Sequence, residues 1–371
     1  MSELIPITAA AIILSILSHR ASEYDPIRCR YGRKDQLWFL VMAVLLILFC
    51  GLRTSYNDTY NYVFLYNSIT DQTSIFQGID WQLGENPAFW IANRIMRALN
   101  FSSQSYLMAY SVITVSLFLW FLRKYSCNLP LSIFLFFTIG IFTFTMAAIK
   151  QCVAMAICMV AIDRALQRKY ILSVLWVLLA AAFHPYALMF LVVPLLMFHP
   201  WSMMSVIMML IFAIAGLIME RLIGTLVDMT TLLGEHFDAE SFLGEGVNPF
   251  RVAVVSVPLV LSFLAKPQIN QKNNRVQDLM VNLSILNAEI MFLGLFGTAN
   301  YFARLANYFL PFQALALPWL LSHFEPRSRK MMTYCAVGGY CMYFLFSYLI
   351  MDSFDYQYDR ITLLSYLQSL F

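Results

Sequence analysis

The segment that decides the fold is residues 129–164, LPLSIFLFFTIGIFTFTMAAIKQCVAMAICMVAIDR. It contains two apolar runs, 129–146 and 148–164, which together are too long for one spanning helix, since about 20 residues cross ~30 Å of hydrocarbon. Lys150 and Gln151 interrupt the apolar pattern near the start of the second run. The segment therefore predicts a helical hairpin in a membrane, with a polar turn at one membrane surface.

Comparable apolar runs occupy most of the remaining chain. The composition is 60% apolar and 12% charged, which on a soluble protein would leave a very large apolar surface exposed. With the two runs above, the full set lies at about 4–18, 37–52, 104–122, 129–146, 148–164, 170–183, 185–198, 201–219, 249–265, 279–297, 301–321 and 331–350. We therefore expect an all-α polytopic integral membrane protein of about 12 transmembrane helices, with residues 1–371 as a single transmembrane domain.

The positions of the 24 Lys and Arg residues predict the orientation, because loops rich in these residues stay in the cytoplasm. One set of alternate loops carries most of them: Arg20, Arg28, Arg30, Arg33, Lys34, Arg123, Lys124, Arg164, Arg168, Lys169, Lys266, Lys272, Arg275, Arg327, Arg329 and Lys330. Both termini are then extracytoplasmic. The cations left on the outer side are Arg53, Arg94, Arg97, Lys150, Arg221, Arg251, Arg304 and Arg360.

Two long segments, residues 53–103 and 220–248, are predicted to form extracytoplasmic loops. In the first, Asn86 is a candidate N-cap and Pro87 suits the first helical position, which predicts a helix over about 86–99. Ala88, Ile91, Ala92, Ile95, Ala98 and Leu99 would share an apolar stripe opposite Asn93, Arg94, Arg97 and Asn100. This pattern favours an amphipathic helix along the membrane interface, either as a structural strap or as a lid over a lipid-linked substrate.

The second loop has an acidic cluster, Glu235, His236, Asp238, Glu240 and Glu245. Its irregular spacing and its glycines fit a mobile loop better than a metal site. The seven cysteines show no metal-binding spacing and no disulfide framework. We expect no metal and no other cofactor.

Polar and aromatic residues follow the second apolar run closely. The stretch from Arg53 to Tyr62, RTSYNDTYNY, places a cation, the carboxylate of Asp58 and three tyrosines within ten residues. This combination suits the recognition of sugar hydroxyls and phosphate together. Tyrosines also gather at membrane surfaces for purely structural reasons, so they alone decide little.

Two further candidates lie at predicted outward turns. Lys150 either extends its ammonium group to the membrane surface or binds a ligand there. His184, in the sequence AAFHPY, is either a structural group or a group that transfers protons near neutral pH.

Arg304 lies about one turn inside the predicted helix 301–321, where a cation facing lipid costs about 2–3 kcal/mol. Tyr301 and Tyr308 share a helical face with it, and Arg251 lies just inside the run 249–265. Several cations at one membrane face, without a metal motif, favour a diphosphate ligand, whose charge they can offset when it departs. Glu289, near mid-membrane, leaves a proton-coupled transporter open as an alternative.

These residues resemble the motifs of the EpsG-like, Wzy-type polysaccharide polymerases of bacterial inner membranes. The matching stretches are Gly51-Leu52-Arg53, Asn57-Asp58-Thr59-Tyr60, Glu85-Asn86-Pro87, Lys150-Gln151, Phe183-His184 and Arg304 to Phe309. They span most of the chain, although each is short. Lys150 departs from the family's usual Arg and so loses the bidentate guanidinium, and Thr59 stands where an aromatic or small residue is usual.

The resemblance implies a glycosyltransferase that polymerises undecaprenyl-diphosphate-linked oligosaccharide repeat units at the periplasmic or outer face, without a metal. Arg53, Lys150, Arg304 and, less directly, Arg251 would then bind the diphosphate. His184 or Asp58 would deprotonate the acceptor hydroxyl, and Tyr60, Tyr301 and Tyr308 would contact substrate. The expected partners are lipid-linked oligosaccharides, membrane lipid and a chain-length regulator, with no nucleic acid. A lipid-linked oligosaccharide flippase is the principal alternative.

Overall fold

The computed structural model describes residues 3–21, 24–25, 30–31, 36–70, 74–232, 246–271, 274–296, 299–351 and 354–358. The predicted acidic cluster from Glu235 to Glu245 and the outer cation Arg360 lie outside these residues. The described chain is all-α apart from two short strand pairs.

Every predicted apolar run contains helix. In the first half of the chain the helices are α1 (Leu4–Ala21), α2 (Leu37–Gly51), α3 (Thr59–Asn67), η1 (Leu83–Glu85), α4 (Pro87–Ala98), α5 (Ser103–Tyr125), α6 (Leu129–Thr138), α7 (Ile141–Ala147), α8 (Ile149–Leu166), α9 (Tyr170–Phe183) and η2 (Pro185–Leu196). In the second half they are α10 (Met203–Leu217), α11 (Met219–Leu232), α13 (Pro249–Val255), α14 (Val257–Leu264), α15 (Lys266–Ile269), α16 (Arg275–Leu293), α17 (Ala299–Asn307), η3 (Leu310–Phe312), α18 (Gln313–Leu321), α19 (Pro326–Phe346) and the π-helical η4 (Ser347–Met351).

Several of these helices have the length and composition of membrane spans. Within the described residues four qualify singly: α1, α5, α16 and Pro326–Met351. The bent pairs α6 with α7 and α10 with α11 raise the number to 6, and five shorter apolar helices accompany them. The chain is therefore an all-α integral membrane protein with four to six candidate spans by this measure. The expected total of about 12 crossings stays a prediction.

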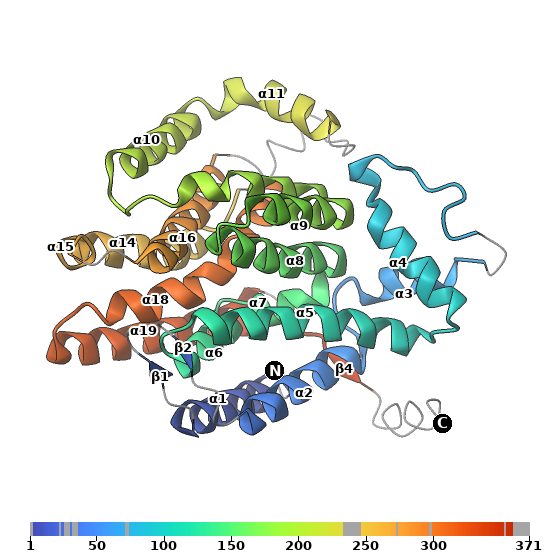
Figure 1. Ribbon diagram of the computed structural model, residues 1–371, viewed down its shortest axis with the longest axis horizontal. Helices are drawn as coiled ribbons and strands as arrows, with labels where there is room; N and C mark the ends of the chain where they lie inside the picture. The colour runs from blue at the N-terminus through green and yellow to red at the C-terminus, as the bar shows by residue number, and fades with distance from the viewer. Residues whose placement is uncertain are drawn as a thin grey trace.

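The long helices lie side by side along one direction, with α8 between α5 and α9 (Figure 1). α3 and α4 lie at one end of this bundle, and α15 lies at the other (Figure 1). α16 is almost wholly enclosed, because nearly all of its residues are buried against neighbouring helices. Phe, Leu, Met and Ile side chains from α5, α6, α8, α16 and α18 fill the core.

Two short strand pairs accompany the helices, and the second joins distant parts of the chain. β1 (Tyr24–Asp25) pairs with β2 (Arg30–Tyr31) in an antiparallel hairpin. β3 (Arg53–Ser55), directly after α2, pairs antiparallel with β4 (Gln357–Tyr358). Tyr356 reinforces the second pair, since its hydroxyl donates to the Phe49 carbonyl at 2.6 Å and its ring stacks on Phe49 with centroids 4.3 Å apart.

The predicted single helix 301–321 is wrong. The segment consists of α17, η3 and α18, with the backbone leaving regular α geometry between Asn307 and Gln313. Pro311, which has no backbone N–H to donate, lies within this break. Arg304 therefore belongs to a short amphipathic helix and not to the interior of a long span.

The predicted loop 220–248 is also more ordered than expected, because α11 occupies its first part. Met219, Ile223 and Thr230 are buried, and their spacing follows one helical face. The segment has no continuous apolar run, because Glu220, Arg221 and Asp228 interrupt it. Apolar runs alone therefore do not predict this amphipathic helix.

The helix predicted at 86–99 corresponds to α4, but its inner face differs from the expectation. Asn86 lies at the N-cap position in the left-handed region (φ 55°) and makes no side-chain capping bond. The buried residues are Pro87, Phe89, Asn93 and Met96, and Tyr110 Oη donates to Asn93 Oδ1 at 2.7 Å. Within the expected apolar stripe, Ile95 is 42% and Leu99 63% exposed, whereas Ala92 is half-buried and packs against the core.

Candidate functional site

Arg53 lies just after the end of α2 and is the first residue of β3. Its side chain is only 1% exposed, and its guanidinium bonds to protein groups: Nε donates to Thr59 Oγ1 at 3.0 Å, and Nη1 donates to the Cys50 carbonyl. Thr59 begins α3, while Cys50 is in the last turn of α2. The contacts that the structure gives Arg53 thus hold these two helix ends together.

Lys150 occupies the second position of α8, directly after the short helix α7. α6 and α7 are bent by 49° relative to each other, and Ala148 begins α8 without a side-chain capping bond. The Lys150 ammonium lies 5.6 Å from the centre of the Phe89 ring on α4. A cation and the positive end of a helix dipole therefore coincide at this point.

Gln151 joins the start of α8 to α17. Its side chain is 3% exposed, and Nε2 donates to the backbone carbonyl of Arg304 at 2.7 Å. The Arg304 side chain itself is exposed. The bond between Gln151 and the Arg304 backbone fixes the two helices that carry Lys150 and Arg304 relative to each other.

His184 lies at the turn between α9 and η2, outside both helices. It is 8% exposed, and Nδ1 lies 2.9 Å from the Tyr308 hydroxyl. Burial, followed by the positive charges of Lys150 and Arg304, lowers the pKa of His184 to about 3. The imidazole is thus neutral at neutral pH, and Lys150, Arg304 and His184 lie within electrostatic reach of one another. We refer to these three residues as the cation cluster.

The two remaining tyrosines of the predicted site surround His184 and are themselves buried. Tyr308 is 0% exposed and Tyr301 is 6% exposed. Tyr301 contacts the Tyr186 ring edge to face, and Tyr186 in turn contacts the His184 ring at a centroid distance of 5.0 Å. Both tyrosines therefore help to position His184.

Tyr62 belongs to the predicted polar stretch Arg53–Tyr62, but the sequence did not single it out as a site residue. It lies on α3 and is hydrogen-bonded to the backbone of Lys150. Burial raises the pKa of the Tyr62 hydroxyl to about 12, and the charges of Asp58 and Arg304 also act on it. Tyr60, the predicted tyrosine, is 75% exposed on the other side of α3. The helical spacing of Thr59, Tyr62 and Tyr66 could have identified the inner face.

Asp58 precedes α3 at its N-cap position and is exposed. Its side chain makes no capping hydrogen bond to α3. The influence of its charge on Tyr62 places it on the same side of the molecule as the cation cluster.

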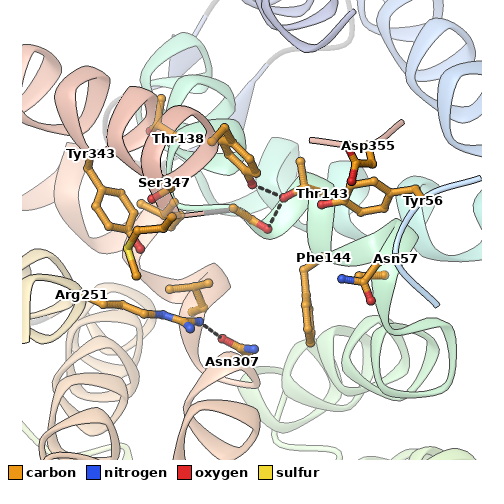
Figure 2. A pocket seen from close by; sticks show the side chains of 16 residues that line it. Tyr56, Asn57, Thr138, Thr143, Phe144, Arg251, Asn307, Tyr343, Ser347 and Asp355 are labelled. Carbon is orange, nitrogen blue, oxygen red and sulfur yellow. Dashed lines mark hydrogen bonds between the residues drawn. The ribbon is translucent and has the colours of Figure 1, made fainter. Parts of the chain in front are cut away.

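Arg251 is separate from the cation cluster and lines a cavity of about 610 Å³. Its Nη2 donates to Asn307 Oδ1 at 2.9 Å (Figure 2). Asp355, Tyr56 and Asn57 lie across the cavity from this pair (Figure 2). His184, Lys150 and Arg304 do not line the cavity. The structure thus brings three of the predicted residues together at the cation cluster and places Arg251 in a neighbouring region.

No group of three or more His, Cys, Asp or Glu side chains is arranged to hold a metal ion within the described residues. The cysteines among these residues are all free thiols.

The arrangement of apolar helices, with a polar and cationic region at the end covered by α3 and α4, defines a helical integral membrane protein with a candidate anion site. A family model described as the EpsG family matches residues 36–360, which is most of the chain. The protein therefore belongs to the EpsG family, which is linked to exopolysaccharide biosynthesis. Neither a search of curated proteins nor a search of solved structures finds a match.

Proposed function

We propose that this protein is a glycosyltransferase that joins undecaprenyl-diphosphate-linked oligosaccharide repeat units into a surface polysaccharide. The observation that carries the proposal is the cation cluster, in which residues from three distant parts of the chain meet beside the start of α8. Family membership supports the polysaccharide context. In this proposal the growing chain moves from its lipid carrier onto the non-reducing sugar of another lipid-linked unit.

The cation cluster suits a leaving diphosphate. As the bond between the anomeric carbon and the diphosphate oxygen breaks, the diphosphate leaves with the bonding electrons. Arg304 offers a bidentate guanidinium, Lys150 offers a point charge, and the start of α8 adds the positive end of the helix dipole. In this proposal these groups, and not a metal ion, offset the developing negative charge.

His184 is our proposed acceptor of the proton from the attacking hydroxyl. Burial, followed by the charges of Lys150 and Arg304, holds its pKa near 3 and makes it a weak base. A diphosphate bound to Lys150 and Arg304 would counter the part of this shift that the two charges cause and so raise the pKa. His184 would then be a stronger base when the donor is bound. Asp58, exposed at the start of α3, is the alternative base.

The other predicted residues receive different proposed roles. Arg53 is buried and holds α2 to α3, so we propose that it positions the site without contacting diphosphate. Tyr308 and Tyr301 would keep His184 in place, and Tyr60 could meet sugar only from the outer surface of α3. Arg251 belongs with the cavity rather than with the leaving group.

The proposed orientation follows from the two ends of α8. Lys150 lies at its start and Arg164 near its end, and 18 residues at 1.5 Å each give a length of about 27 Å, comparable to the hydrocarbon core. Arg164 and Lys124 belong to the set of loops predicted to be cytoplasmic. We therefore propose that the cation cluster faces the periplasm or exterior of a bacterial inner membrane, with about 12 crossings and both termini outside.

A reconstituted reaction tests the proposal. The full-length protein in lipid nanodiscs is mixed with purified undecaprenyl-diphosphate-linked repeat units, and the products are separated by size. We expect a ladder of polymer without added nucleotide sugar. Movement of intact lipid-linked units across a vesicle membrane without any ladder would overturn the proposal in favour of the flippase, for which the buried Glu289 on α16 would be the first residue to test.

A further inference from the structure

The cavity beside Arg251 lies where several helices lose their regular geometry. Ile139 and Gly140 separate α6 from α7, and Gly140 has a left-handed backbone (φ 84°). Asn307 and Leu310 flank the break between α17 and η3, while Ser347 and Tyr348 belong to the π-helical η4. All of these residues line the cavity. In membrane proteins irregular backbone is tolerated where it lines a cavity, and it often marks a binding site.

The polar groups of the cavity wall are matched to a neutral, hydroxyl-rich ligand. Arg251 contributes one positive charge and Asp355 one negative charge. Asn57, Asn307, Ser347 and Thr143 add amides and hydroxyls, which both donate and accept hydrogen bonds. The wall therefore carries one charge of each sign, whereas the cation cluster combines two cations with a neutral imidazole.

Aromatic rings contribute to the apolar part of the wall, together with aliphatic side chains such as Leu310. Tyr56, Tyr343 and Tyr348 line the cavity, and such rings offer flat apolar faces together with hydroxyl groups. A volume of about 610 Å³ lies within the ~300–1,000 Å³ typical of pockets that enclose small organic ligands. Sugar rings present apolar C–H faces and polar hydroxyl edges, so this mixture fits carbohydrate.

Thr138 gives an independent sign of a ligand. Its side chain is 3% exposed on the cavity wall, and Oγ1 has no hydrogen-bond partner among the described residues. A buried hydroxyl without a partner costs about 1–3 kcal/mol. A sugar hydroxyl in the cavity would satisfy it.

We propose that this cavity is a carbohydrate subsite that holds neutral sugar residues of a repeat unit. The inference rests on the proposed function, because the cavity and the cation cluster would then bind two parts of one substrate. They are neighbours in the chain: Asn307 follows Arg304 by one helical turn on α17, and Ala147 comes shortly before Lys150. Sugar in the cavity would thus extend from diphosphate at the cluster.

Binding to the full-length protein in nanodiscs tests the subsite. The first probe is the lipid-free repeat-unit oligosaccharide, released from its carrier by mild acid, and the second is inorganic pyrophosphate. We expect Tyr343→Ala and Asp355→Asn to weaken oligosaccharide binding at least about tenfold and to leave pyrophosphate binding unchanged. Matched controls are Tyr334→Ala, exposed on the same helix α19, and Asp228→Asn, exposed on α11; both should bind the oligosaccharide normally.

Thr138→Val provides a variant that keeps the shape of the wall. Removing only the buried hydroxyl should preserve folding and still weaken oligosaccharide binding about threefold or more. Wild-type oligosaccharide affinity in Thr138→Val and in Tyr343→Ala would overturn the subsite, and so would loss of pyrophosphate binding in the cavity variants. If Arg304→Ala binds pyrophosphate normally while the cavity variants lose oligosaccharide, the diphosphate site fails and the carbohydrate subsite stands.

Discussion

The two ends of α8 carry similar cations in opposite settings. At the end near Leu166, Lys124 contacts the Asp163 carboxylate and Arg164 lies 3.9 Å from it, while Tyr125 and Gln167 also donate to it at 2.6 and 2.7 Å. At the other end Lys150 and Arg304 act together on the neutral His184. The first group is a network in which a carboxylate already balances the cations. The second brings two cations close to a neutral imidazole, an arrangement suited to an anion from outside.

The largest effect that this difference predicts is loss of activity at the start of α8. Arg304→Ala and Lys150→Ala should each lower the rate of polymer formation by about 100-fold, because each removes a charge that stabilises the leaving diphosphate. The measurement is the product ladder from equal amounts of folded protein. Lys330→Ala, at the start of α19, is the matched control and should retain the wild-type rate. A wild-type product ladder from both Arg304→Ala and Lys150→Ala would contradict the proposed functional difference between the two ends of α8.

The next largest effect should be on stability, at the opposite end. Asp163→Asn should lower the free energy of unfolding by about 2 kcal/mol, because Lys124 then loses its charged partner. Thermal unfolding in nanodiscs measures this change, with the exposed Asp228→Asn as control. The activity of the molecules that remain folded should not change. Normal stability with impaired activity would mean that the Asp163 network belongs to the site.

A third prediction concerns the protonation of His184. Its pKa of about 3 lies below the ~6.5 of an unperturbed histidine, so the unfolded state binds more protons between these values. Stability should therefore fall as the pH drops from about 6.5 toward 3. Saturating pyrophosphate should raise the His184 pKa by about one unit or more and reduce this loss. Titration of labelled histidine by NMR, with and without pyrophosphate, measures the shift, and an unchanged pKa would contradict coupling between His184 and a bound anion.

The smallest expected effect belongs to Tyr62. Tyr62→Phe removes the hydroxyl that is bonded to the Lys150 backbone, which should cost about 1 kcal/mol and lower polymer formation about fivefold. Tyr334→Phe, on the exposed surface of α19, serves as control. A loss as large as that of Lys150→Ala would show that Tyr62 contacts the substrate directly.

Much of the helical fold could be predicted from the sequence, because a continuous apolar run can be recognised from neighbouring residues alone. The errors arose where helices break or are amphipathic. The irregular segment after Asn307 and the helix α11 both mix polar and apolar residues within a few turns. For α4 the amphipathic pattern was visible, but its inner face was not, since Tyr110 on another helix satisfies the buried Asn93.

The candidate site was predictable only in part. Lys150, His184 and Arg304 are each recognisable in the sequence as polar residues near predicted helix ends, and Gln151 stands beside Lys150. Spacing along the chain does not show which distant residues come together in the folded protein. Arg251 meets Asn307 across the cavity, and residues of several separate segments enclose that space. The aromatic and hydroxyl residues of this wall resemble ordinary membrane-surface residues when each is considered alone.

The hydrogen bond from Gln151 to the Arg304 carbonyl has a consequence for inhibition. Because it ties α17 to the first turn of α8, the attachment points of the two cations are held apart by a set distance before any substrate arrives. Little conformational entropy remains to be lost when an anion bridges them. A rigid molecule with two phosphonate groups at a matching separation should therefore compete better than a flexible one of equal charge, and Gln151→Leu should erase that preference while both cations remain.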